Sequence, residues 1–357
     1  MPVVAEGFKP ALGAPYNSLW TRDNAYTMWH DPGRFTAAQR RQFVSYYLSR
    51  RSTGAEADPD GGTLPANYVA DRIDAAGVAA WKNAGASTLP FADGIAFVVL
   101  ALWVDWNETG DTSTFTTNQT AIDACLAALP RAGNGCVTFG GAGSVDYGFT
   151  DSIKKTGDVT YGTALLAWAY RMLSEIAGEN GVGTYSTAFA TAKAGLATLR
   201  KPSGWYKGSS NNQYEKDDVW ATALIVAENL LDSPSDRLTS AYRIVDSYQW
   251  GQISSGGWVR HLPEGQFWVG ATGVVGDYQN GGYWLTPLWD CYRAAQLIDQ
   301  DIADGWANAA LNTLADQIAD EGTVGANTAP YEWFNDVTVS VPKGYTPSAA
   351  IVRRFVS

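Results

Sequence analysis

Basic residues and histidine are scarce in this chain of 357 residues. Lys and Arg number 25 against 36 Asp and Glu, which gives a net charge of −11 with His neutral. Such a chain has no basic patch with which to displace counterions from nucleic acid or to bind an anionic membrane surface. We therefore expect no nucleic-acid partner and no membrane partner. The charge favours a neutral or cationic ligand, or serves solubility.

Cysteine and long apolar runs are also rare. The three cysteines are Cys125, Cys136 and Cys291, an odd number that excludes complete pairing within the chain. Cys125 and Cys136 either form a disulfide or are buried free thiols, and with two histidines no zinc spacing is present. We expect no metal and no cofactor. The longest apolar run, 95–104, is too short to span a bilayer. No signal peptide is visible, so we expect a cytoplasmic protein or one whose leader is not part of this sequence.

Aromatic residues, in contrast, are abundant: 15 Trp, 18 Tyr and 12 Phe. Two explanations compete for this surplus, a core of large rings and a sugar-binding cleft. Sugar rings stack their C–H faces on flat aromatic side chains, and their hydroxyls take hydrogen bonds at the edges.

Apolar and amphipathic helices alternate along the chain. Segments that are apolar on all sides are predicted to be buried, and each is followed by a segment with one polar face. Four such pairs are predicted: 90–106 with 117–129, 159–176 with 185–199, 218–231 with 235–248, and 284–298 with 306–319. Residues 20–50 and 345–356 supply the remaining helices. The expected fold is all-α, a double-layered helical barrel forming a single domain over 1–357, with short strands at 257–260 and 337–341.

Long polar loops precede the predicted inner helices, at 58–88, 132–155, 204–217 and 250–280. Loops of this length are uncommon in a compact domain unless they build a site. In a barrel of alternating helices they all reach the same end, where we expect a cleft.

Five segments in or near these loops combine acids with aromatic residues. Trp20, Arg22 and Asp23 suit either sugar hydroxyls or a structural ion pair at a helix start. Asp93 is expected to cap a helix whose start lies at the cleft. In the third segment, Asp151 either acts in catalysis or forms a turn, and Asp158 is expected to cap the following helix.

The last two segments have a stronger functional signature. In 278–284, glycines allow a close approach of backbone to ligand, and amides recognise hydroxyls. Glu332 lies between large aromatic residues, where an unpaired carboxylate is unfavourable unless it has a role. The complete set of expected sugar-binding residues is Trp20, Arg22, Asp23, Asp93, Asp146, Phe149, Asp218, Trp220, Tyr278, Gln279, Asn280, Gly281, Tyr283, Trp284 and Trp333.

The order of these motifs resembles the six-hairpin glycosidases, the clan of neutral trehalases, processing α-glucosidases and neutral invertases, and amylo-α-1,6-glucosidase-like proteins. The resemblance rests on 20–23, 148–152, 278–284 and 331–335. It implies an (α/α)6 barrel and an inverting mechanism on a neutral, α-linked substrate. By position Asp151 matches the general acid, with Asp158 as a rival, and Glu332 matches the general base.

The sequence departs from that pattern at two places. Phe149 and Thr150 stand where trehalases have a tryptophan before the acid, and Lys154 and Lys155 replace a substrate-binding arginine. These differences leave the sugar and the linkage open. Two other classes also remain open, a non-catalytic carbohydrate-binding protein and a lyase or epimerase on a similar barrel. The sequence does not indicate an oligomeric state.

Overall fold

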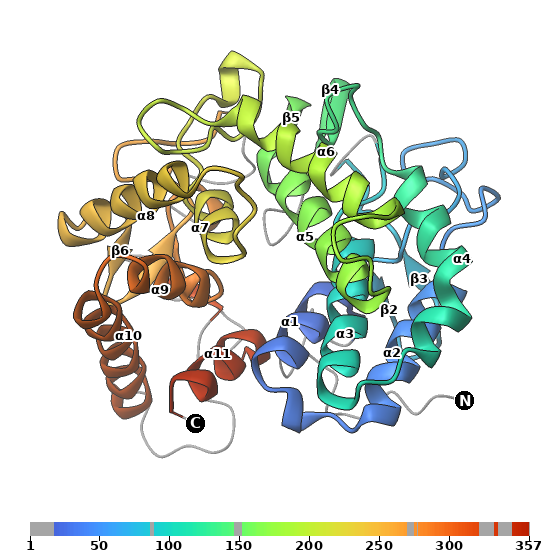
Figure 1. Ribbon diagram of the computed structural model, residues 1–357, viewed down its shortest axis with the longest axis horizontal. Coiled ribbons are helices and arrows are strands. Elements are labelled where there is room, and N and C mark those ends of the chain that lie inside the picture. The colour runs from blue at the N-terminus through green and yellow to red at the C-terminus, as the bar shows by residue number, and fades with distance from the viewer. Residues whose placement is uncertain are drawn as a thin grey trace.

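The computed structural model describes residues 18–85, 89–145, 152–269, 275–276, 278–320, 332–334 and 345–356. Within them the fold is mostly helical, with three small antiparallel sheets. Figure 1 shows one set of helices around the middle of the molecule and a second set outside it. This arrangement is compatible with the expected helical barrel.

The inner set contains the four helices that the sequence predicts to be buried, together with α1 and α11 from the segments 20–50 and 345–356. Its members are α1 (Thr21–His30), α3 (Gly94–Thr109), α5 (Thr160–Ile176), α7 (Val219–Ala227), α9 (Leu288–Gln296) and α11 (Thr346–Val356). Every residue of α1 and of α7 is buried. Contacts run from α11 through α1, α3, α5 and α7 to α9. Phe355 of α11 packs against Trp289 and Tyr292 of α9, at ring-centroid distances of 5.5 and 5.0 Å.

The outer set contains the amphipathic helices. These are α2 (Ala37–Ser49), α4 (Ser113–Ala128), α6 (Thr184–Leu199), α8 (Pro234–Gln249) and α10 (Gln300–Asp320). Local signals define their ends: Thr36 and Gln39 form a capping box at the start of α2, and Ser233 caps α8 with Pro234 as its first residue. All four predicted pairs are therefore present, and 20–50 contributes the pair of α1 and α2.

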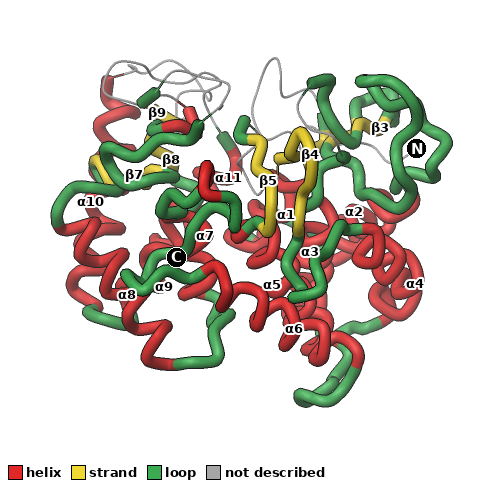
Figure 2. Tube along the Cα trace, turned by 90° about the horizontal axis from the view of Figure 1, so that it is seen from above, coloured by secondary structure: helices red, strands yellow, loops and turns green. Residues whose placement is uncertain are grey.

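Short strands within the described ranges form the sheets. The first sheet contains β1 (Leu19–Trp20), β2 (Arg72–Ile73) and β3 (Ala79–Ala80), and the second pairs β4 (Thr138–Val145) with β5 (Lys154–Asp158). The third has the order β6 (Ser254–Ser255), β7 (Trp258–Arg260), β8 (Tyr283–Trp284) and β9 (Trp333–Phe334). Figure 2 shows the strands gathered toward one end of the helices, on the upper side of the view.

Some predicted boundaries are wrong. The inner helix expected from 284 begins at Leu288, because Tyr283 and Trp284 pair as strand β8 with β7 and β9. Helix α10 begins at Gln300 instead of 306, and α3 at Gly94 instead of 90. The strand expected at 257–260 is confirmed as β7, and the one expected at 337–341 lies outside the described residues.

All three cysteines are buried and free, which excludes the alternative of a Cys125–Cys136 disulfide. Within the described parts of the chain, no helix is long and apolar enough to cross a membrane.

Candidate functional site

The strand-bearing end of the fold carries most of the residues that the sequence singles out. There β1, β5 and β8 lead directly or within a few residues into the inner helices α1, α5 and α9. The amino end of a helix carries a partial positive charge and free backbone N–H groups, so it favours acceptors and negative groups nearby. The site described below is built around these junctions.

Arg22, in the first turn of α1, is the centre of a buried charge cluster. Its Nη1 lies 2.6 Å from Asp71 Oδ1 and 3.6 Å from Asp93 Oδ2, and all three side chains are buried. Asp71 also pairs with Arg72, whose guanidinium lies 5.1 Å from the centre of the Trp20 ring. The expected capping role of Asp93 is wrong, because its carboxylate makes no capping hydrogen bond to α3 and faces Arg22 instead.

Asp23 is buried beside this cluster. The Tyr345 hydroxyl, just before α11, donates a 2.5 Å hydrogen bond to its Oδ1. Burial raises the pKa of Asp23, and the Arg22 charge and the Tyr345 hydrogen bond only partly oppose that rise. The buried ion pair of this region therefore joins Arg22 to Asp71, 49 residues away, and Asp23 instead ties α1 to the start of α11.

The segment 278–284 holds two neighbouring loops in place. Gln279 Oε1 accepts hydrogen bonds from the backbone N–H and the hydroxyl of Ser152, at 2.8 and 2.7 Å. Asn280 Oδ1 accepts from the Trp268 backbone N–H at 2.7 Å. Both amide side chains are buried, so these oxygens serve the fold.

The backbone conformation and the close packing of the protein require a glycine at position 281. Its φ is +140°, and a Cβ there would lie 2.7 Å from Gly276 Cα and 3.1 Å from Arg260 Nη2. The close approach expected between Gly281 and a ligand is therefore an approach between two turns of the same loop. Tyr283 is half-buried, with the Arg260 guanidinium 5.6 Å from its ring centre.

Strand pairing brings Glu332 next to this segment. In the antiparallel register of β8 and β9, Tyr283 is opposite Phe334 and Trp284 is opposite Trp333. Glu332 directly precedes β9 and is 7% exposed. The motif at 278–284 thus contacts two others, one through Ser152 and one through the strand that follows Glu332.

Trp220 and Trp284 lie in the core beneath this arrangement. Each is 1% exposed, and their ring centres are 5.6 Å apart in an edge-to-face contact. The Tyr278 ring is 5.0 Å from that of Trp284. Faces so completely covered are not open to a sugar, so the expectation that Trp220 and Trp284 stack on substrate is wrong for this arrangement. They support the segment instead.

A second buried charge cluster lies at the start of α7. Asp218 caps α7 through a 3.0 Å hydrogen bond from the Ala221 N–H, as a residue at that position is suited to do. Its Oδ1 is 3.3 Å from His261 Nε2 and its Oδ2 is 3.5 Å from Lys155 Nζ, with no side chain of the three exposed. Its predicted contact with substrate is therefore replaced by contacts with protein.

The same cluster fixes Trp268. Its indole N–H donates to His261 Nδ1 at 3.2 Å, and Lys155 Nζ lies 4.7 Å from its ring centre. Because Asn280 accepts from the backbone of Trp268, the cluster and the segment 278–284 form one connected network. Sequence reasoning missed Asp71, Tyr345 and Trp268, and it noted Lys155 in an acidic motif without assigning it this buried ion pair.

Asp158 does not cap α5. The residue at the cap position is Val159, and the Asp158 carboxylate accepts a 2.9 Å hydrogen bond from Asn134 Nδ2. The expected cap is therefore wrong. Asp146, Phe149 and Asp151 lie outside the described residues. Among the side chains that the structure does describe, no group of three or more His, Cys, Asp or Glu is arranged to hold a metal ion.

Comparison of the sequence with family models and with curated proteins finds no match. Comparison of the fold with solved structures does. A mannosylglycerate hydrolase of family GH63 from Thermus thermophilus, in complex with Tris and D-glycerate, is similar with a TM-score of 0.64 and 12% identity, over 99% of this chain and 97% of that chain.

Two further solved structures have the same fold. A protein described as a wild-type glycosidase has a TM-score of 0.62 and 14% identity, over 98% of this chain and 90% of its own. A rhamnosidase from Klebsiella oxytoca with bound rhamnose has a TM-score of 0.62 and 13% identity, over 95% of this chain and 57% of its own. The TM-scores and the coverage show a shared fold, and that fold is one that these glycosidases use.

Proposed function

We propose that this chain is a glycoside hydrolase that cleaves O-glycosidic bonds in a neutral, α-linked oligosaccharide or glycan. Its domain is a single (α/α)6 barrel over 1–357, in which the inner and outer helices described above form the two layers. The likeness in fold to the GH63 hydrolase and the rhamnosidase supports this class of enzyme.

One observation carries the proposal. The segment 278–284 bonds to Ser152 on one side and pairs with the strand that follows Glu332 on the other. Asp151 is the neighbour of Ser152 in the chain. We therefore propose that Asp151 and Glu332, the two carboxylates that the resemblance singles out, face this one segment although they are far apart in the sequence.

In the proposed mechanism the two carboxyl groups have different tasks. Asp151 protonates the oxygen of the leaving group, and Glu332 removes a proton from a water molecule that attacks the anomeric carbon from the opposite face. The glycosidic C–O bond breaks as the new C–O bond forms, so the configuration inverts. An inverting pair is separated by about 6.5–9.5 Å, which leaves room for that water.

The surrounding charges suit a neutral substrate. Arg22 is balanced by Asp71 and Asp93, and Lys155 by Asp218, so these clusters add no large field of one sign. Trp20, Tyr278, Tyr283 and Trp333 are the aromatic residues that we propose to contact sugar, together with Phe149. A histidine-dependent lyase is disfavoured, because His261 is fully buried with its two ring nitrogens facing Trp268 and Asp218.

Two substitutions test the proposal. Asp151→Asn and Glu332→Gln are each expected to lower kcat about 10³-fold or more on a panel of neutral α-linked disaccharides and oligosaccharides, because each removes one of the two proton transfers. Glu215→Gln, at an exposed carboxylate, is the control and is expected to keep full activity. Circular dichroism and the unfolding midpoint check that the variants fold.

Two further readouts sharpen this test. Proton NMR of the first product formed is expected to show the anomer opposite to that of the substrate. Asp158→Asn distinguishes the rival acid: we expect it to retain most of the activity, since its carboxylate bonds to Asn134. Full activity of both Asp151→Asn and Glu332→Gln would falsify the two-carboxylate assignment.

A further inference from the structure

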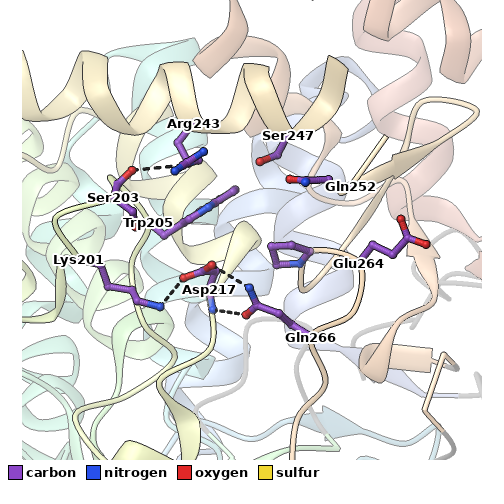
Figure 3. A pocket seen from close by; sticks show the side chains of 10 residues that line it. Lys201, Ser203, Trp205, Asp217, Arg243, Ser247, Gln252, Glu264 and Gln266 are labelled. Carbon is purple, nitrogen blue, oxygen red and sulfur yellow. Dashed lines mark hydrogen bonds and ion pairs between the residues drawn. The ribbon is translucent and has the colours of Figure 1, made fainter. Parts of the chain in front are cut away.

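A pocket lies on the outer wall of the fold, beside helix α8. It is bounded by α8 and by two stretches of loop at 201–217 and 252–266, and its volume is about 270 Å³. We call it the α8 pocket. Figure 3 shows side chains from α8 and from both loops pointing toward a common space. This volume is close to the lower end of small-molecule sites, which begin at about 300 Å³.

Two largely buried residues present to the pocket polar atoms that the protein itself leaves unused. Ser247 and Trp205 line it with exposed fractions of only 2% and 4%. Neither the Ser247 hydroxyl nor the Trp205 indole N–H takes part in a hydrogen bond within the described residues. In Figure 3 the Ser247 hydroxyl points away from α8 toward the pocket. Both atoms are accessible from the pocket and not bonded to protein, so they are available to a ligand there.

Further hydrogen-bonding groups surround these two. The Gln252 amide and the Glu264 carboxylate are exposed to the pocket and have no side-chain partner in the described part of the chain. Arg243, one turn before Ser247 on the same face of α8, donates through Nε to the Ser203 carbonyl at 3.3 Å and makes no ion pair among the described side chains. The pocket therefore presents both hydrogen-bond donors and hydrogen-bond acceptors.

The opposite wall is held rigid by bonds of its own. Lys201 Nζ lies 2.6 Å from Asp217 Oδ1. Gln266 donates to Asp217 Oδ2 at 2.8 Å and accepts from the Asp217 N–H at 2.9 Å. These contacts, drawn as dashed lines in Figure 3, fix the side chains of Lys201, Asp217 and Gln266 relative to one another.

The charges of the lining balance. Lys201 and Asp217 neutralise each other, and the remaining Arg243 and Glu264 carry opposite signs. An anion would meet Glu264 and Asp217, and a cation would meet Arg243 and Lys201. A group that both donates and accepts hydrogen bonds without charge satisfies all of the unused atoms, and the hydroxyl is that group.

We infer that the α8 pocket binds a neutral, polyhydroxylated ligand of the size of one monosaccharide, at a site separate from Glu332. The same two loops hold both sites, because Asp217 precedes Asp218 and Gln266 precedes Trp268 by two residues. Asp218 and Trp268 belong to the buried network below 278–284, while Asp217 and Gln266 line the α8 pocket. The inference goes beyond the proposed hydrolysis and holds whether or not Glu332 is catalytic.

The indole N–H of Trp205 provides a direct probe. We would titrate the ¹⁵N-labelled protein with D-glucose, D-mannose and L-rhamnose and follow the indole resonances, assigning Trp205 by the loss of one signal in Trp205→Phe. At least one sugar is expected to shift the Trp205 signal saturably, with a Kd on the order of 1 mM for a ligand of this size. The same titration on Glu332→Gln is expected to give the same Kd.

Matched substitutions locate the binding. Ser247→Ala and Gln252→Ala, each of which removes one hydrogen-bonding group, are expected to weaken binding about 3- to 10-fold. Gln249→Ala changes an exposed glutamine of α8 three residues earlier, outside the pocket, and is expected to change nothing. Hydrolysis by these three variants is expected to equal that of the wild type.

Three results would overturn the inference. One is the absence of any Trp205 shift with all three sugars at 0.1 M or about 100 times the expected Kd. Another is an equal weakening by Gln249→Ala. The third is a shift caused as strongly by sodium phosphate or glycine as by any sugar, which would identify an ionic ligand. Loss of the proposed hydrolytic function alone leaves the Trp205 titration unaffected, so the two failures are distinguishable.

Discussion

Two buried carboxyl groups at the starts of neighbouring inner helices differ in ionisation state: one is ionised and the other is protonated. Asp218 caps α7, and Asp290 lies in the first turn of α9. Burial acts to raise the pKa of Asp218, but interactions with His261 and Lys155 outweigh it and hold the pKa at about 2. Burial raises the pKa of Asp290 to about 8, and repulsion by Glu228 adds to the rise.

The two pKa values differ because the side chains have different interaction partners, and not because one side chain is more deeply buried. Both side chains are buried, at 0% and 4% exposure. Asp218 faces an ammonium group and an imidazole, whereas Asp290 Oδ1 has no hydrogen-bond partner within the described residues. Nearby Glu228 takes Arg171 and Arg293 as its own partners. A buried carboxylate at a helix start is therefore ionised where a positively charged side chain faces it. It is protonated where the nearby arginines form ion pairs with another acid.

The largest expected effect comes from removing the charge of Asp218. Asp218→Asn keeps a side chain able to cap α7 but removes the buried carboxylate charge that faces Lys155. Breaking one partner of a buried ion pair is expected to lower the free energy of unfolding by about 3–5 kcal/mol. Urea unfolding at pH 7 measures this loss. The neighbouring Asp217→Asn affects a less buried pair with Lys201 and is expected to lower it by less than about 1 kcal/mol.

The same comparison predicts how acid acts on the wild type. Because the folded pKa of Asp218 lies below its unfolded value, its stabilisation is present above pH 4 and is lost as the pH falls toward 2. The difference in unfolding free energy between wild type and Asp218→Asn is expected to shrink over that range. A difference that stays constant from pH 5 to pH 2 would contradict the ionised state assigned to Asp218.

Asp290 is expected to show the reverse dependence on pH. Its folded pKa of about 8 exceeds the unfolded value, so its contribution is fully present below about pH 4 and is lost as the pH rises through 8. Asp290→Asn does not titrate. Its stability relative to wild type is expected to increase by up to about 1.4 kcal/mol per pH unit between pH 5 and 7.

Chemical unfolding at several pH values measures this slope. Asp301, an exposed acid in the first turn of α10, serves as the control site. The difference in unfolding free energy between Asp301→Asn and wild type is expected not to change with pH. If the difference in unfolding free energy between Asp290→Asn and wild type also does not change from pH 5 to pH 7, Asp290 is ionised in the folded protein.

The sequence predicts the helices of this fold better than it predicts either of these carboxylates. Helix α3 is recognisable because 95–104 is apolar on every face, a pattern that needs no knowledge of the neighbours. The state of Asp218 depends on Lys155 in strand β5 and on His261 just after strand β7. No local pattern encodes those distances.

The candidate site shows the same limit. Spacing and residue type place 278–284 and Glu332 in a common region, and the pairing of β8 with β9 agrees. Residue type alone could not separate buried Trp284 from an aromatic residue at a cleft, because a tryptophan suits both environments. The partner of Arg22 is equally hidden in the sequence, since Asp71 is 49 residues away in a polar loop.

The smallest expected effect concerns Arg354 of α11, whose charge lowers the pKa of Asp290 only as the last of several contributions. Arg354→Gln is expected to raise the pKa of Asp290 slightly, and so to extend to higher pH the range over which stability falls. The readout is the stability difference between Arg354→Gln and the double variant with Asp290→Asn, followed from pH 6 to 9. The adjacent Arg353→Gln, at a side chain that is 65% exposed and paired with Asp31, is the matched control. Two outcomes would contradict the view that the nearest charges, and not burial alone, set the ionisation of Asp290. In one, the loss of stability attributed to Asp290 moves to lower pH in Arg354→Gln. In the other, it moves equally in Arg353→Gln.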